Sequence, residues 1–193
     1  MKVRKIVFDI ETSNVFQDVG KADPALLDLS VVSIHDSDTD KYTSYTQEEL
    51  SNLWPIIEKA DMLIGYNSDH FDIPLLNKYY SGDLTKIKSL DLLKEIKNSL
   101  GRRLKLDSVA EGTLNRRKIG HGLQATTWWK NGEVEKVKKY CEEDVRITKE
   151  LYEYALKNGV LKYKDLGETR EIKLDTKTWE EKEDGSITHT LPF

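Results

Sequence analysis

The sequence is poor in cysteine and has no long apolar run, and each absence excludes a class of protein. The single cysteine, Cys141, rules out an internal disulfide framework and a zinc site built from cysteines. No apolar stretch approaches the length of a membrane-spanning helix, so no membrane segment is expected. Met1 is followed by the charged residues Lys2, Arg4 and Lys5, which lead into a predicted strand and not into the apolar core of a secretory signal. Together these features predict a cytoplasmic protein.

Charge is what the chain has in abundance. Charged residues make up 33% of the 193 residues and hydrophobic residues 38%, a balance typical of a soluble globular protein. The net charge of -4 does not indicate a nucleic-acid binder, but the cations are concentrated in residues 84–120. That segment holds ten Lys or Arg against four acids. Two interpretations stay open, a basic surface that attracts a polyanion and a solvated helix face.

Hydrophobic periodicity predicts alternating strands and helices. Strands are expected over residues 3–11, 29–35, 41–46, 62–66 and 87–90. Helices are expected over residues 47–60, 71–80, 89–100, 107–114 and 133–157. Hairpin strands followed by alternating helices and strands predict an α/β fold around a mixed sheet.

The chain is expected to divide at residue 159. Residues 1–159 would form one α/β domain, and residues 160–193 would form a C-terminal extension. Within the extension, the segments 171–179 and 186–193 flank a turn-forming Asp184-Gly185 pair. A terminal hairpin and a loose polar tail are both compatible with this pattern.

Asp9 and Glu11, in the apolar run KIVFDIET, are the most informative residues of the chain. Side chains alternate between the faces of a strand, so both carboxylates point to one side. Ile6, Phe8 and Ile10 then point to the other side, toward a core. Two like charges held side by side repel each other, and a divalent metal ion offsets that repulsion most directly.

Two further acidic elements follow along the chain. The run Asn67–Asp72 comes directly after the predicted strand 62–66, where side chains commonly project into a functional crevice. Tyr140 and Asp144 are four residues apart and share one face of the predicted helix 133–157. A tyrosine hydroxyl beside a metal-bound carboxylate can orient an attacking water molecule. Each acidic element alone is weak evidence for a metal site. The evidence comes from the order and spacing of all three along the chain and from the strands and helices on which they are predicted to lie.

The three runs FDIET, NSDHFD and YCEED resemble exonuclease motifs I, II and III of the DEDDy 3′–5′ exonucleases. The second run is especially similar to its counterpart in the proofreading domain of family B DNA polymerases, and small stand-alone predicted exonucleases are similar as well. The resemblance covers about residues 3–157. It implies a ribonuclease H-like three-layer fold, with a central mixed five-stranded sheet flanked by helices.

The resemblance also implies a catalytic set. Its water-orienting tyrosine falls on Tyr140, and its metal-binding carboxylates fall on Asp9, Glu11, Asp72 and Asp144. Asp9 would bridge two Mg²⁺ or Mn²⁺ ions, and Asp72 would give outer-shell support. Oxygen ligands without a convergent Cys or His set suit these ions. Asp69 stays an alternative ligand to Asp72 if the loop is turned.

Further residues are expected to contact the substrate. By resemblance, the terminal base lies near Thr12, and Asn67 and Phe71 line the same pocket. Phosphates of the incoming strand would meet Arg116, Arg117 and Lys118. Trp128 and Trp129 are interpreted either as a base-stacking platform or as core residues.

The expected function is metal-dependent hydrolysis of single-stranded DNA from the 3′ end by a two-metal-ion mechanism. Two alternatives stay open. One is a 3′–5′ exoribonuclease, because the sequence does not show what would contact a 2′-hydroxyl. The other is a catalytically silent nucleic-acid-binding domain of the same fold.

Overall fold

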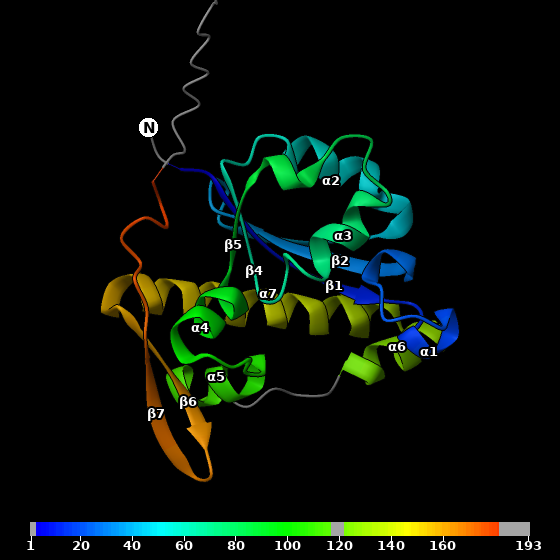
Figure 1. Ribbon diagram of the computed structural model, residues 1–193. Helices are drawn as coiled ribbons and strands as arrows, with labels where there is room; N and C mark the ends of the chain where they lie inside the picture. The colour runs from blue at the N-terminus through cyan, green and yellow to red at the C-terminus, as the bar shows by residue number, and fades with distance from the viewer. Residues whose placement is uncertain (1–2, 117–121, 182–193) are drawn as a thin grey trace, which may run out of the picture.

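The computed structural model describes residues 3–116 and 122–181, and its centre is one mixed sheet (Figure 1). Five strands lie in the order β3-β2-β1-β4-β5. Their bounds are β1 Lys5–Thr12, β2 Leu29–Asp36, β3 Lys41–Thr46, β4 Met62–Gly65 and β5 Lys88–Asp91. β1 pairs antiparallel with β2 and parallel with β4, which confirms the mixed sheet that the sequence predicts.

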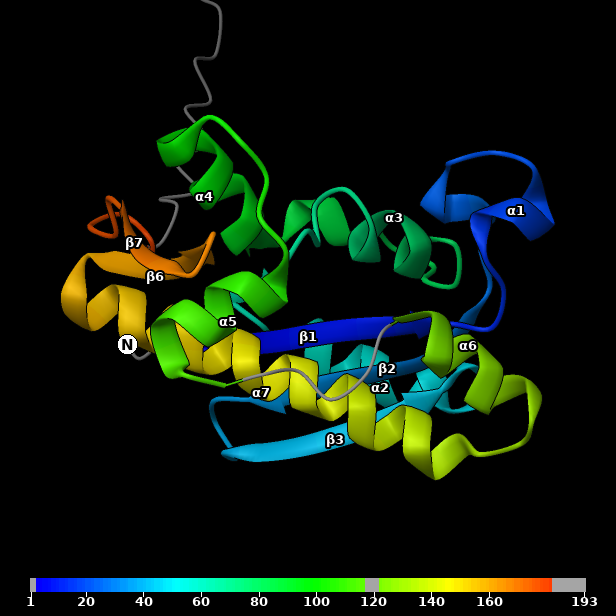
Figure 2. The same cartoon turned by 90° about the horizontal axis from the view of Figure 1, so that it is seen from below.

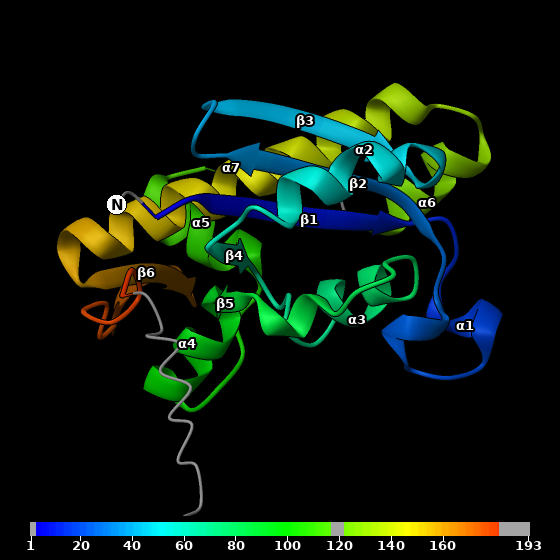
Figure 3. The same ribbon diagram turned by 90° about the horizontal axis from the view of Figure 1, so that it is seen from above.

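Helices cover both faces of the sheet and complete three layers (Figure 3). The helices that pack on the sheet faces include α2 Leu50–Ile57, α3 Asp72–Asn77 and α7 Val134–Asn158. α2 and α3 pack against Ile6, Phe8 and Ile10, the face of β1 that the alternation assigns to the core. α7 crosses the opposite face, where Val145 and Leu151 join the core. The predicted α/β architecture is therefore confirmed.

Four further α-helices belong to the described part of the chain. Their bounds are α1 Phe16–Val19, α4 Leu92–Leu100, α5 Leu106–Leu114 and α6 Gly122–Lys130. The sequence does not predict α6, because its threonine and tryptophan residues favour strands as much as helices. Tertiary packing settles the conformation: Ala125 is fully buried, and the Thr126 hydroxyl donates to the Thr12 carbonyl oxygen at 3.2 Å.

The pairing of β1 with β2 carries one irregularity. Glu11 lies opposite Val31, whereas the next residue, Thr12, lies opposite Leu29. Ser30 therefore has no partner on β1 and forms a bulge. The regular ladder of β1 ends at this point, directly after its second carboxylate.

The C-terminal extension contains a hairpin made from different strands than expected. β6 (Val160–Asp165) pairs antiparallel with β7 (Glu168–Lys173), and Ile172 lies opposite Leu161. Both of these side chains are buried in the core cluster that includes α7. Residues 171–173, at the start of the expected hairpin, therefore pair with the preceding strand β6. Residues 182–193, with the expected turn, lie outside the described part.

The segment after β7 returns to the body of the fold. Trp179 stacks on Tyr152 of α7, with 6.0 Å between ring centroids, and Glu180 pairs with Lys5 of β1. The division of the chain at residue 159 stays a prediction. Among the described residues, none of the helices combines the length and the hydropathy that crossing a bilayer requires.

Candidate metal centre

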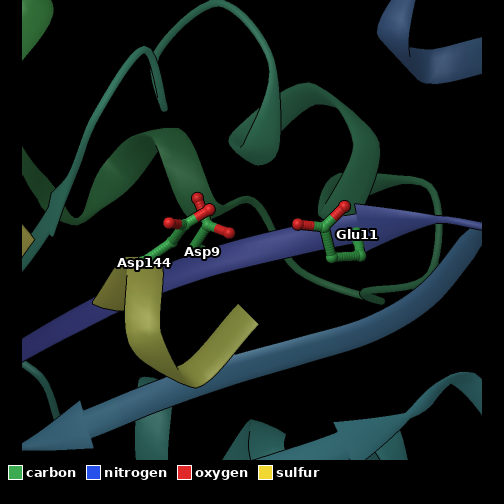
Figure 4. A group of neighbouring side chains, drawn as sticks. All are labelled: Asp9, Glu11 and Asp144. Carbon is green, nitrogen blue, oxygen red and sulfur yellow. The ribbon is translucent and has the colours of Figure 1, made fainter. Parts of the chain in front are cut away.

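Three carboxylates from two elements meet on the α7 side of the sheet (Figure 4). Asp9 and Glu11 project from β1, and Asp144 comes from α7 where this helix crosses the strand. One ligand oxygen from each of the three lies within 4.8 Å of the others. Glu11 is only 9% exposed and Asp144 only 4%. The structure thus joins the first and third acidic elements, which are about 130 residues apart in sequence.

This cluster fits a hard divalent cation. Burying like charges together is unfavourable unless a cation or hydrogen-bond donors compensate them. All three groups offer carboxylate oxygens, the ligands that Mg²⁺ and Mn²⁺ prefer. Asp9, Glu11 and Asp144 would therefore hold such an ion.

Cys141 contacts this cluster as a hydrogen-bond donor and does not turn it into a zinc site. Its thiol donates to the Asp9 carbonyl oxygen at 3.2 Å and lies 3.7 Å from Asp9 Oδ2. Burial raises the pKa of Cys141 well above its ordinary value, and the nearby charges of Asp9 and Glu11 raise it further. The thiol therefore keeps its proton and acts as a donor, whereas a zinc site would require the thiolate.

Tyr140 lies one helical turn before Asp144 and is 6% exposed. The ring of Trp128 contacts it edge-on, with 5.8 Å between centroids and an interplanar angle of 71°. Both Trp128 and Trp129 are half-buried and pack against the cluster formed around Tyr140 and Cys141. Trp128 thus fixes the position of the tyrosine ring from the α6 side.

Asp72 begins α3 and stands apart from the group of three. It is 4% exposed, and the backbone amide of Ile10 on β1 partly offsets the rise in the pKa of its carboxyl. Asp72 therefore lies beside β1, as an outer position would require. Asp69, the alternative ligand, instead accepts from the Ser89 hydroxyl at 2.6 Å and pairs with Lys94 at 2.8 Å.

Asp91 is a positioning residue that the sequence reasoning missed. Its Oδ1 accepts the backbone N–H of Asn67 at 2.7 Å and of Leu93 at 2.9 Å, and its Oδ2 accepts that of Asp69 at 3.2 Å. One buried carboxylate therefore caps α4 and holds the loop before Asp72, where Asn67 has a φ of 68°. An Asp before an apolar helical run is an N-cap signal. The predicted helix 89–100 placed this residue inside the helix instead.

A cavity of about 460 Å³ opens beside Glu11. Thr12 and Phe71, two of the predicted substrate-binding residues, line it. The remaining walls include Phe16 of α1 and Thr126 of α6. Asn67 is not among the lining residues.

Of the three predicted phosphate-binding residues, the structure describes Arg116. Arg116 pairs with two acids of α7, Glu150 at 3.1 Å and Glu143 at 3.6 Å. Its charge is thus compensated within the chain. Arg117 and Lys118 lie outside the described residues.

Comparison with known proteins agrees with this architecture. The family model of the RNase H superfamily matches residues 6–156. The chain belongs to the RNase H superfamily. Among solved structures it is similar to the family B DNA polymerase from the hyperthermophilic archaeon Pyrobaculum calidifontis, with a TM-score of 0.62 and 20% sequence identity. The match covers 81% of this chain and 25% of the polymerase, so the chain spans about a quarter of that protein's length. No curated protein is a significant match.

The family assignment confirms the ribonuclease H-like fold implied by the sequence resemblance. At 20% identity, the likeness to the polymerase concerns the fold alone. The assignment of individual site residues stays a prediction that the geometry above supports.

Asp72 gives this superfamily member a testable pH dependence. Burial, with the charge of Asp91 as the smaller cause, raises the pKa of Asp72 from 3.8 to about 8. Without metal, the folded carboxyl keeps a proton that the unfolded chain has lost. The free energy of unfolding should therefore fall as the pH rises from about 4 to about 8. We expect Asp72→Asn to flatten this dependence, measured by urea unfolding in EDTA across that pH range.

The matched control is Asp107→Asn, the same chemical change on α5 outside the site. It should keep the wild-type dependence on pH. Equal slopes for wild type and Asp72→Asn would show that Asp72 is not the titrating group.

Removing the Asp91 carboxylate should destabilise the fold. Asp91→Ala leaves the α4 cap and the Asn67 and Asp69 amides without their acceptor, which should cost at least about 2 kcal/mol of unfolding free energy. Asp83→Ala is the control, because Asp83 caps only the short helical turn at Leu84–Lys86. Its cost should be about 1 kcal/mol. Denaturant unfolding measures both, and equal losses would remove the special role of Asp91.

Proposed function

We propose that the protein is a metal-dependent 3′–5′ exonuclease that acts on single-stranded DNA by a two-metal-ion mechanism. One observation carries the proposal: a largely buried cluster of three carboxylates, with Tyr140 one helical turn away, lies beside a cavity. Membership of the RNase H superfamily supports a nuclease with a nucleic-acid substrate.

Asp9, Glu11 and Asp144 would hold the ions, and Asp72 would support them from α3. Bound Mg²⁺ or Mn²⁺ would supply charge neutralisation at phosphorus and a nucleophile at neutral pH. The carboxylates enter from a central strand and a long helix. Both elements are packed into the core, so the cluster is held rigidly before substrate arrives.

Tyr140 would orient the attacking water through its hydroxyl. The tyrosine shares the inward face of α7 with Asp144, and Trp128 limits the freedom of its ring. A positioned hydroxyl lowers the entropic part of the activation barrier, because it holds the water molecule in the orientation that in-line attack requires.

The cavity beside Glu11 favours attack at a strand end. Its size suits one nucleoside, and Phe71 and Thr12 offer an apolar face and a polar group. Phe16 of α1 contacts Phe71 edge-on, with 6.1 Å between centroids, and also lines the cavity. A cavity that ends beside the metal-binding residues would accept a terminal nucleotide, so hydrolysis would release one nucleotide at a time.

The first test is the digestion of 5′-labelled single-stranded DNA and of the matching RNA. With Mg²⁺ or Mn²⁺, we expect a ladder that shortens from the 3′ end of DNA, and EDTA should abolish it. Glu11→Gln should lower the rate at least about 10³-fold, because it removes one ligand charge from the centre. The control Glu135→Gln, an exposed change in the first turn of α7, should retain wild-type activity.

Each other result selects an alternative. Faster digestion of RNA would make the protein an exoribonuclease. Binding of both strands without hydrolysis under either metal would make it a silent binding domain.

Tyr140→Phe tests the orientation of the water. Loss of the hydroxyl should lower kcat about 10²-fold and leave KM nearly unchanged, since the ring and its contact with Trp128 remain. Tyr154→Phe, at the far end of the same helix, should have wild-type kinetics. Retention of full kcat by Tyr140→Phe would remove the hydroxyl from the mechanism.

A further inference from the structure

Arg103 lies against the loop that leads to Asp72. It belongs to the connection between α4 and α5, which is tied to the end of β4 by two hydrogen bonds. The Tyr66 hydroxyl donates to the Leu104 carbonyl oxygen at 2.9 Å, and the Arg103 guanidinium donates to Asn67 Oδ1. The position of Arg103 is therefore set by the fold, although its side chain is exposed.

No acid in the described part of the chain compensates the charge of Arg103. Its partner Asn67 is a neutral amide, and within residues 3–116 and 122–181 no carboxylate forms an ion pair with it. The adjacent Arg102 differs, because it pairs with Asp165 at 3.2 Å and lies over the ring of Tyr163. The two neighbouring arginines thus carry the same charge, but Arg102 is already paired with an acid and Arg103 can still bind an anion.

Arg103 also lies on a definite side of the metal centre. β4 runs parallel to β1, so Asn67 follows β4 at the same sheet end as Glu11. The connection between α4 and α5 lies toward the first part of β1, and α1 and α6 lie toward the end of this strand (Figure 2). The cavity is lined by residues of α1 and α6 and so lies toward the end of β1. A strand whose end fills the cavity would continue past the carboxylates toward Arg103.

We propose that Arg103 binds a phosphate group of the nucleic-acid strand, on the 5′ side of the nucleotide held in the cavity. The inference rests on the proposed function and adds a strand-binding residue to it. A guanidinium presents a planar fork of donors that matches phosphate oxygens. Its hydrogen bond to Asn67 is to a neutral acceptor, so exchange for a charged phosphate is favourable.

The salt dependence of strand binding measures this contact. Fluorescence anisotropy of a 5′-labelled DNA 12-mer, with Asp144→Asn as the inactive parent in Mg²⁺, gives the affinity at each salt concentration. Arg103→Ala should lower the slope of log affinity against log salt by about 0.7, the value for one phosphate on a single strand. Between about 50 and 200 mM salt, the affinity ratio of parent to variant should fall about 2.5-fold.

Arg102→Ala is the matched control, since it changes the net charge equally at the adjacent position. It should keep the slope of the parent. Arg103→Lys should keep most of the slope and weaken affinity, because the charge remains and the fork is lost. In the active protein, Arg103→Ala should raise KM and leave kcat unchanged.

Two results would overturn the inference. Equal changes of the salt-dependence slope for Arg102→Ala and Arg103→Ala would show that the loss of net charge, and not a specific phosphate contact of Arg103, causes the effect. An unchanged slope, with kcat lowered alike by Arg103→Ala and Asn67→Ala, would show that Arg103 only braces the loop. Either result with normal hydrolysis by wild type leaves the proposed function intact, whereas absence of hydrolysis and of strand binding defeats both proposals.

Discussion

Mutual repulsion among Asp9, Glu11 and Asp144 is the constraint on which the rest of the structure depends. Three carboxylates whose oxygens approach within 4.8 Å stay together only if the elements that carry them cannot separate. β1 meets this requirement because it pairs with a strand on each side. α7 meets it through 25 residues whose inward face is buried along most of its length. The core therefore supplies the free energy that holds an unfavourable site in place.

Around this centre, several of the described polar groups accept hydrogen bonds from neutral donors. The Cys141 thiol donates to the Asp9 carbonyl oxygen, and the backbone amides of Asn67, Asp69, Leu93 and Lys94 donate to the Asp91 carboxylate. Amide donors stabilise carboxylates without adding cations that would compete with a metal ion.

Much of the centre could be predicted from the sequence because it follows two local periods. The two-residue period of β1 placed Asp9 and Glu11 on one face, and the helical period placed Tyr140 with Asp144. Asp91 was missed because its role depends on amides from a loop more than twenty residues away. Arg116 looked available because nothing local shows that acids of α7 compensate it. The strand pairing of Ile172 with Leu161 likewise depends on a buried face that only the folded core defines.

The bulge at Ser30 divides β1 into two parts with different freedom to vary. Before it, each residue is matched to a partner on β2, so one inserted or deleted residue would turn Glu11 away from the face that it shares with Asp9. Beyond it, the chain leaves the ladder, and residues 13–28 carry α1 and part of the cavity wall. Insertions or deletions in residues 13–28 would reshape the cavity without turning either carboxylate to the other face of the sheet. Relatives of this fold can therefore differ in the shape of the cavity while keeping the same count of residues between the two acids.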